Sequence, residues 1–222
     1  MKFEGIIFDF DGVLIESEAL GNAHLASYLT GIGHPISQEE AVTRFTGLAG
    51  ADFIGAVERW IGKALGEDFY ASRKIEDERV MRDGIDEVTG AIAFIRALPP
   101  ELPRAIASSS STAWIARHLD HIGLRDAFGE HLYSGKEHVA RGCGKPAPDL
   151  YLHAAAAIGV DITRAAILED SIVGATGAVA SGAYVIGFCG GSHCATGHAD
   201  RLRALGVHAI AQDFDEVAAL LA

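Results

Sequence analysis

The sequence predicts an α/β protein in which strands and helices alternate around a parallel sheet and an all-helical segment is inserted after the first strand. Beyond residue 85, short apolar runs alternate with amphipathic segments, which is typical of strand–helix units. Residues 17 to 83 instead show helical periodicity and no convincing strand. Apolar residues make up 49% of the 222 residues, which is enough to fill a core of this size.

The first strand is expected at Phe3–Phe8, where an apolar stretch runs directly into Asp9-Phe10-Asp11-Gly12. Because side chains of an extended chain alternate between faces, Asp9 and Asp11 lean to one side while Phe10 packs. Two carboxylates so close repel each other unless a cation lies between them, and Mg²⁺ binds such oxygens while leaving room for phosphate. The alternative is an ordinary turn at a strand end, since Asp and Gly are common turn residues.

A helical insert is expected over residues 17–83. Apolar residues recur there at helical spacing, beginning with Leu20 and Leu25. Ser37, with Glu40 three residues later, fits the capping box that starts many helices. Because the chain enters this insert directly after the acidic strand end, we expect the insert to lie above that site.

Further strands are predicted by short apolar runs bounded by turn residues. They are expected at Arg104–Ala107, His131–Ser134, Ala165–Leu168, Ala183–Gly187 and His208–Ala211. Amphipathic segments between these runs predict the connecting helices. The helices are expected at Val88–Leu98, Thr112–Ile122, Pro148–Ile158, Val173–Ser181, Gly197–Leu205 and Phe214–Leu221. Strands joined by helices run parallel, so their carboxyl ends meet at one edge of the sheet.

Polar residues follow three of these strands, at the edge where open parallel sheets bind ligands. The serine run 108–111 offers hydroxyl and backbone N–H groups to an anion, although it would serve equally as a helix N-cap. Lys145 precedes a proline that holds it extended, whereas an ordinary loop lysine is solvated. Glu169 and Asp170 end an apolar strand, where acids also favour a helix N-terminus. Together with the carboxylates of the first strand end, these residues predict a metal site with groups that hold a phosphoryl group.

The charge balance argues against two classes of binding partner. Lys and Arg total 18 against 30 Asp and Glu, a formal net charge of −12, which argues against a nucleic-acid backbone or an anionic membrane.

The three cysteines form neither a disulfide framework nor a CxxC pair, so we expect free thiols in a reducing compartment. The N-terminal residues lack the basic and apolar regions of a signal peptide, and we therefore expect a cytoplasmic protein.

The uncharged stretch 171–192 has the length of a membrane span. Its six glycines argue against one, because they predict a small-residue helix that ends near Gly182 and a short strand after it. We therefore expect no membrane partner.

The order and spacing of these groups resemble the haloacid dehalogenase-like superfamily, in the subgroup with a helical cap inserted after the first motif. The four family motifs are matched by Asp9 to Val13, Ser108, Lys145, and Glu169 with Asp170. Gly144-Lys145-Pro146 followed by Asp149 is characteristic of the branch that contains β-phosphoglucomutase and small-metabolite phosphatases. The resemblance implies a doubly wound, Rossmann-like sheet formed by residues 1–16 and 84–222, and a mobile helical cap formed by residues 17–83.

The resemblance also implies a role for each motif residue. Asp9 would be the nucleophile that forms an aspartyl-phosphate, and Asp11 the acid and then the base, each proton transfer contributing ~10²–10⁴ in rate. Mg²⁺ would be bound by Asp9, the backbone carbonyl of Asp11, and Asp170. Glu169 would orient Lys145 and the water shell of the metal. The phosphate contacts would come from Ser108, Lys145, and backbone N–H groups near Gly12 and Ser109.

The residue types at four positions favour phosphate ester hydrolysis. True haloacid dehalogenases lack an acid at the position of Asp11. Ser111 stands where the mutases of this branch carry a lysine, Gly50 where their cap presents an arginine, and Gly21 where their cap carries a histidine. A mutase must bind a bisphosphate, and the missing cations would remove hydrogen bonds worth about 1.5–3 kcal/mol each. We therefore predict a phosphatase, with a sugar phosphomutase as the alternative.

Other interpretations come from different classes of protein. One is a sugar-phosphate-binding protein that has lost turnover. Another concerns Cys189, His193, Cys194 and His198, which offer zinc ligands, although their spacing matches no standard finger and an ordinary loop is favoured.

The short cap favours a small substrate, a phosphorylated sugar or sugar acid. Its contacts are expected among Glu16, Ser17, Asn22, Arg44, Thr46 and Gly47. Trp60 and Trp114 lie at helical positions and are expected to be packing residues. The sequence leaves the oligomeric state open.

Overall fold

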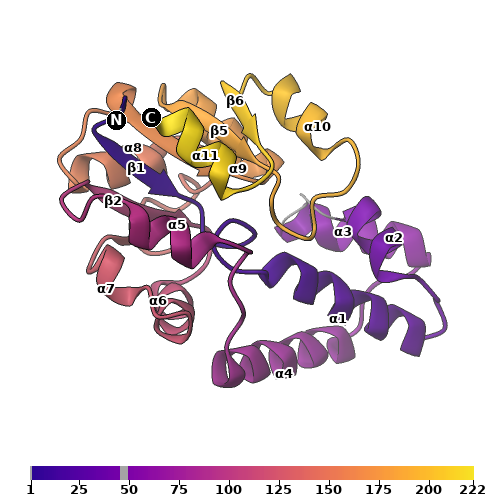
Figure 1. Cartoon of the computed structure of the whole chain (residues 1–222). Helices are drawn as coiled ribbons and strands as arrows, with labels where there is room; N and C mark the ends of the chain where they lie inside the picture. The colour runs from indigo at the N-terminus through magenta and orange to yellow at the C-terminus, as the bar shows by residue number, and fades with distance from the viewer. Residues whose placement is uncertain (1, 46–49) are drawn as a thin grey trace. The chain divides into compact units, whose positions relative to one another are not determined.

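The computed structural model describes residues 2–45 and 50–222. The chain forms two compact units, most of whose helices and strands are labelled in Figure 1. The first, called the sheet unit, consists of Met1–Glu16 and Ile85–Ala222, and the second, called the helical unit, consists of Ser17–Gly84. The chain therefore leaves the sheet unit after its first strand and returns to it once.

The sheet unit contains a parallel sheet of six strands in the order β3-β2-β1-β4-β5-β6. The strands are β1 (Gly5–Phe8), β2 (Arg104–Ser108), β3 (Leu132–Ser134), β4 (Ala165–Glu169), β5 (Tyr184–Phe188) and β6 (Ala209–Ala211). From β1 the chain winds outward to β3, crosses back to β4 beside β1, and winds outward on the other side. This is the doubly wound, Rossmann-like order, and the predicted fold class is confirmed.

The helices of the sheet unit also follow the expected order. They are α5 (Ala91–Ala97), α6 (Thr112–His121), α7 (Arg125–Phe128), α8 (Asp149–Ala157), α9 (Ile172–Ala180), α10 (His198–Ala204) and α11 (Phe214–Leu221), with a 3₁₀ turn η1 at Ile162–Arg164. The sequence did not predict α7 or η1, because a single turn is too short to show a helical period.

Apolar residues on both faces of the sheet explain why helices cover both. Ile7 of β1 lies in a buried cluster with residues of α8 and α9 on one face. Its neighbour Phe8 points to the other face, where its ring lies 6.3 Å from that of Phe94 in α5 and 5.7 Å from that of Phe128 in α7. The Phe94 ring in turn stacks on Phe214 of α11 at 5.1 Å. Burial of both faces is what a continuous apolar strand such as β1 requires.

Three strands, β2, β4 and β5, extend one residue beyond their predicted carboxyl ends, and two of these added residues are polar. Ser108 belongs to β2 and pairs with β3, and Glu169 belongs to β4 and pairs with β5. Asp9 continues the ladder in the same way, because its N–H donates to the carbonyl of Leu168 at 2.9 Å. The ladder therefore fixes the backbone from which these polar side chains project.

The helical unit has its own core. Its helices are α1 (Ser17–Gly31), α2 (Gln38–Phe45), α3 (Gly50–Ile61) and α4 (Glu67–Asp83). Leu25 and Leu29 of α1 pack in one buried cluster with residues of the other three helices. The predicted cap before α2 is confirmed, because Ser37 Oγ accepts the N–H of Glu40 at 3.0 Å. The side chain of Glu40 pairs instead with Arg44 at 2.8 Å.

The uncharged stretch 171–192 forms α9 and β5, as its glycines predict. Within residues 2–45 and 50–222, none of the helices combines the length and the apolar character needed to cross a membrane.

Candidate active site

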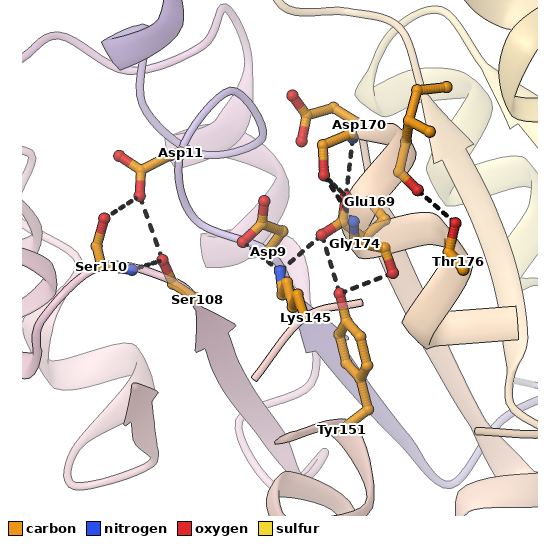
Figure 2. Close-up of polar contacts among 12 residues, drawn as sticks. Asp9, Asp11, Ser108, Ser110, Lys145, Tyr151, Glu169, Asp170, Gly174 and Thr176 are labelled. Atoms are coloured by element: carbon orange, nitrogen blue, oxygen red, sulfur yellow. Dashed lines mark hydrogen bonds and ion pairs between the residues drawn. The ribbon is translucent and has the colours of Figure 1, made fainter. Parts of the chain in front are cut away.

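Lys145 joins two carboxylates at the carboxyl ends of β1 and β4 (Figure 2). Its ammonium donates to Oδ1 of Asp9 at 2.8 Å and to Oε1 of Glu169 at 2.6 Å. The side chains of Lys145, Asp9 and Glu169 are buried, with exposed fractions of 3%, 9% and 0%. The structure thus brings together three of the predicted site residues, from two adjacent strands and the loop before α8.

Glu169 is held on both of its oxygens. The Tyr151 hydroxyl donates to Oε1 at 2.9 Å, and the N–H and hydroxyl of Ser171 donate to Oε2 at 2.8 and 3.0 Å. A carboxylate with this many donors cannot rotate freely, so it fixes the position of Lys145 as well. Sequence reasoning missed Tyr151, because a tyrosine inside an apolar helix gives the same signal as an ordinary core residue.

Negative charge exceeds positive charge at these strand ends. Burial and the carboxylate of Glu169 raise the pKa of Asp9 well above its usual value, and Asp170 adds to this against the opposing effect of Lys145. Burial disfavours the ammonium of Lys145, but Asp9 and Glu169 outweigh that effect and raise its pKa well above the usual value. Lys145 therefore stays charged, and the carboxylates favour a further cation.

The residues present fit a magnesium ion. Asp9, Glu169 and Asp170 are buried, and one oxygen from each lies within 4.8 Å of the others. Carboxylate and carbonyl oxygens are the ligands that Mg²⁺ prefers in proteins. Gly12 has a φ of 79°. A Cβ at Gly12 would lie 2.3 Å from Oδ2 of Asp170, so glycine is what allows the backbone to approach this carboxylate.

Asp11 does not join this cluster in the structure. Ser110 and Ser108 donate their hydroxyls to its Oδ2 at 2.7 and 3.2 Å, and the indole of Trp114 donates to its Oδ1 at 3.1 Å. Figure 2 shows the carboxylate of Asp11 directed toward the serines. The sequence predicts same-side carboxylates from strand alternation, but β1 ends at Phe8 and the chain turns through Gly12, so alternation does not reach residue 11.

Trp114 is therefore more than the packing residue that its helical position predicts. It lies in the first turn of α6, whose N-cap is Ser111, and this position directs its indole N–H back to Asp11. The ring of His118 packs edge-on against Trp114 at 4.4 Å and is completely buried. Burial lowers the pKa of His118 to about 4, so a neutral ring supports the tryptophan.

His193 and His198, two of the four residues considered as alternative zinc ligands, both contact Asp170. Nε2 of His193 lies 2.8 Å from Oδ2 of Asp170, and Nε2 of His198 lies 2.6 Å from its backbone carbonyl. Both histidines are buried, with exposed fractions of 1% and 3%. The thiol of Cys194 lies 3.4 Å from Nε2 of His193. The loop after β5 thus joins the strand-end site, which the sequence did not predict.

A family model described as haloacid dehalogenase-like hydrolase matches residues 3–182. The chain belongs to this family. The resemblance found in the four motifs is therefore confirmed, and the strand-end cluster contains residues of the first, third and fourth motifs.

Known proteins resemble this hydrolase over most of their length. The 6-phosphogluconate phosphatase of Escherichia coli (strain K12) is 26% identical over 196 residues, which cover 86% of this chain and 85% of that protein. A solved haloacid dehalogenase-like protein of unknown function from Agrobacterium tumefaciens is 37% identical, with a TM-score of 0.89 over 99% of this chain and 97% of that chain. A family hydrolase from Deinococcus radiodurans R1, solved with bound phosphate and sodium, is 29% identical, with a TM-score of 0.83 over 99% and 95% of the two chains.

The remaining predicted residues of the hydrolase lie in several places. Ser109 is exposed just after β2. The carboxylate of Glu16 accepts the N–H and hydroxyl of Ser192, at 3.1 and 2.6 Å. Ser17 begins α1, and the amide of Asn22 donates to a backbone carbonyl one turn earlier in that helix. Each of these contacts lies within a single unit.

Arg44 lies in the helical unit beside a hollow. The hollow is lined by Arg44, Phe45, Ala56, Arg59 and Trp60. Trp60 packs against the Phe45 ring at 6.2 Å, as its helical position predicts. Thr46 and Gly47, which the sequence also proposes as substrate contacts, lie outside the described residues.

Replacing Gly174 by Ala is expected to lower the free energy of unfolding by about 1–3 kcal/mol, because a Cβ there would lie 1.7 Å from Oε1 of Glu169. Elsewhere in a helix this change stabilises by about 0.5–1 kcal/mol. Gly21→Ala in α1 is the matched control, since a Cβ there meets nothing within 4 Å. Urea unfolding of both variants tests the packing around Glu169, and equal stabilisation would contradict it.

Proposed function

We propose that this hydrolase is a Mg²⁺-dependent phosphatase that removes phosphate from a small phosphorylated metabolite through an aspartyl-phosphate intermediate. One observation carries the proposal. The buried ammonium of Lys145 lies between Asp9 and Glu169, beside Asp170, at the point where the strand order reverses. A nucleophile, a fixed cation and a set of metal ligands are thereby combined at the edge where parallel sheets bind substrate.

Asp9 is the proposed nucleophile. Lys145 holds its Oδ1. An oxygen of the Asp9 carboxylate attacks phosphorus, the bond to the leaving oxygen breaks, and an acyl phosphate forms. Lys145 remains beside the transferred group and stabilises the charge on its equatorial oxygens. A water molecule then attacks phosphorus, which releases phosphate and restores the carboxylate.

Asp9, the backbone carbonyl of Asp11, and Asp170 are the proposed metal ligands. When bound, Mg²⁺ supplies positive charge that offsets the repulsion between the carboxylate and the anionic substrate. Glu169 is proposed to orient Lys145 and the water shell of the metal. Its two oxygens are already engaged by Lys145, Tyr151 and Ser171, so it is not proposed as a ligand itself.

Asp11 is the proposed proton carrier, and it must leave its present partners to act. Its side chain would rotate away from Ser108, Ser110 and Trp114, protonate the leaving oxygen, and then accept a proton from the attacking water. The same rotation frees the hydroxyl of Ser108, which can donate only one proton, for an oxygen of the phosphoryl group. Backbone N–H groups near Gly12 and Ser109 are proposed to bind the remaining oxygens; the N–H of Gly12 itself donates to the carbonyl of Ile15 at 2.9 Å in the structure.

A phosphorylated sugar or sugar acid is the proposed substrate. The relative named 6-phosphogluconate phosphatase acts on a phosphorylated sugar acid, and the Deinococcus radiodurans relative was solved with phosphate. The helical unit is the proposed cap, and Arg44 with Arg59 is a suitable pair of cations for a substrate carboxylate. The free cysteines among the described residues accord with a cytoplasmic location, which we also propose.

Removal of Mg²⁺ tests the function directly. Dialysis against EDTA is expected to lower phosphate release from para-nitrophenyl phosphate to the uncatalysed rate, and added Mg²⁺ is expected to restore it, because buried carboxylates repel an anionic ester. A panel of sugar phosphates and phosphorylated sugar acids then identifies the substrate class. β-Glucose 1-phosphate serves as the mutase control, because a mutase yields glucose 6-phosphate and a phosphatase yields glucose and phosphate. Binding of these esters without release of phosphate would make the protein a binder and contradict the proposal.

A further inference from the structure

The loop between β5 and α10 reaches the strand-end site through Asp170. His193, in the middle of this loop, is 1% exposed, and its Nε2 lies 2.8 Å from Oδ2 of Asp170. Since a carboxylate oxygen accepts hydrogen bonds, Nε2 of His193 is the nitrogen that carries the proton. His193 therefore restrains the direction of the Asp170 carboxylate.

His198, at the start of α10, holds the same aspartate from its backbone. Its Nε2 lies 2.6 Å from the carbonyl of Asp170, and Arg201 lies 3.2 Å from its Nδ1. A guanidinium only donates hydrogen bonds, so Nδ1 of His198 accepts and Nε2 carries the proton. The contact with Arg201 thus sets the tautomer in which His198 donates to Asp170.

The loop itself is anchored to the segment that follows β1. The N–H and hydroxyl of Ser192 donate to Glu16, at 3.1 and 2.6 Å. A Cβ at Gly191 would lie 2.7 Å from the carbonyl of Gly12, so the two backbones are in direct contact. His193 is therefore held between two fixed neighbours rather than on a free loop.

We propose that His193 and His198 are positioning residues that orient Asp170 as a metal ligand, one through its carboxylate and the other through its carbonyl. The inference rests on the proposed function, in which Asp170 binds Mg²⁺. Partners of this kind fix the direction of a ligand, and their loss typically lowers metal affinity about 10–100-fold.

A zinc site formed by the same residues is the competing interpretation. His193, Cys194 and His198 place one ligand atom each within 4.8 Å of the others. However, Nε2 of each histidine is already engaged by Asp170, and the remaining nitrogen of His198 faces the cation of Arg201. Zinc bound by His198 would have to break its contact with Asp170 or displace the guanidinium of Arg201, which favours the positioning role.

Metal affinity without substrate tests the proposal. His193→Gln keeps an N–H donor near the position of Nε2, whereas His193→Met has a similar size and no donor. In Mn²⁺ titrations followed by electron paramagnetic resonance, and in Mg²⁺ competition, we expect His193→Met to weaken binding about 10–100-fold and His193→Gln to stay within about threefold of the unmodified protein. The same pair of substitutions at His198 is expected to show the same order. His121→Met, on a partly exposed side chain of α6, is the matched control.

Two measurements make the outcome decisive. Thermal unfolding of the metal-free variants is expected to show that His193→Met and His193→Gln are both fully folded at the temperature of the titrations, which separates positioning from folding. Saturating Mg²⁺ is expected to restore kcat to His193→Met, because its defect lies in affinity.

Equal Mn²⁺ affinity of both variants would overturn the proposal, as would one equivalent of bound zinc that Cys194→Ser removes. Asp170→Asn distinguishes failure of the proposed metal site from failure of the positioning role. If Asp170→Asn binds Mn²⁺ normally, the proposed metal site is wrong. If Asp170→Asn binds Mn²⁺ weakly and His193→Met binds it normally, only the positioning role is wrong.

Discussion

Replacement of Asp9 by Asn is expected to lower kcat for phosphate release by about 10⁴–10⁶-fold. Loss of the nucleophile has an effect of this size because the other catalytic groups depend on it. The amide has the same shape but cannot attack phosphorus. It also removes one of the buried carboxylates around Lys145, so a loss of activity through unfolding is not expected.

The measurement that checks this prediction is a single-turnover assay with acid quench. The unmodified enzyme is expected to show an acyl-phosphate adduct that hydroxylamine releases, and Asp9→Asn none. Asp86→Asn is the matched control, since the Asp86 side chain is 98% exposed and is expected to leave both adduct and turnover unchanged. A full-sized adduct in Asp9→Asn would assign the nucleophile to another residue.

Replacement of Lys145 by Met is expected to lower the free energy of unfolding by about 3–5 kcal/mol at pH 8, because it leaves buried carboxylates without their ammonium. Lys145 is 3% exposed and contacts Asp9 and Glu169 at 2.8 and 2.6 Å. Activity is expected to fall as well, since the same ammonium is proposed to stabilise the transferred phosphoryl group. Guanidinium unfolding of metal-free protein measures the first effect separately from the second.

The loss of stability in Lys145→Met is expected to depend on pH. Folding raises the pKa of Asp9, so above the usual pKa of an aspartate the folded state binds more protons than the unfolded chain. The contribution of Asp9 to stability is therefore greatest below that usual value and is lost as pH rises through the folded pKa. Because Lys145 lowers the pKa of Asp9, the Lys145→Met substitution raises that pKa further. The stabilising contribution of protonated Asp9 then persists to higher pH in the variant. The difference between the two proteins should accordingly shrink as the pH is lowered from 8 toward 5.

Lys136→Met provides the control for these measurements. Lys136 is exposed in the loop after β3, so its replacement is expected to change the free energy of unfolding by less than about 0.5 kcal/mol at either pH. Two results would contradict the prediction: a loss of unfolding free energy in Lys145→Met no larger than in this control, or a loss that grows as the pH falls. Either would show that negative charge does not exceed positive charge around Lys145.

Local patterns in the chain were enough to predict the sheet and the groups at its edge. Each strand is a short apolar run with a turn after it, and burial on both faces makes this signal strong. The proximity of Asp9 and Glu169 follows from the parallel sheet, because the carboxyl ends of its strands meet at one edge. Lys145 lies in the loop before α8, and only the folded structure shows its ammonium between the two carboxylates.

The partners of the charged residues were decided by tertiary packing. Trp114 lies 103 residues beyond Asp11, and the sequence gives it only the signal of a helix interior. His193 lies on a loop, and His198 lies at the start of α10, where that loop ends. The path of the loop depends on the anchoring of Ser192 by Glu16, 176 residues away. Periodicity reports which face of an element is buried, but it contains no information about which distant loop covers that face. Hydrogen bonds between such loops form only when the whole sheet is assembled, and so the tautomers and directions of these side chains became visible only in the folded structure.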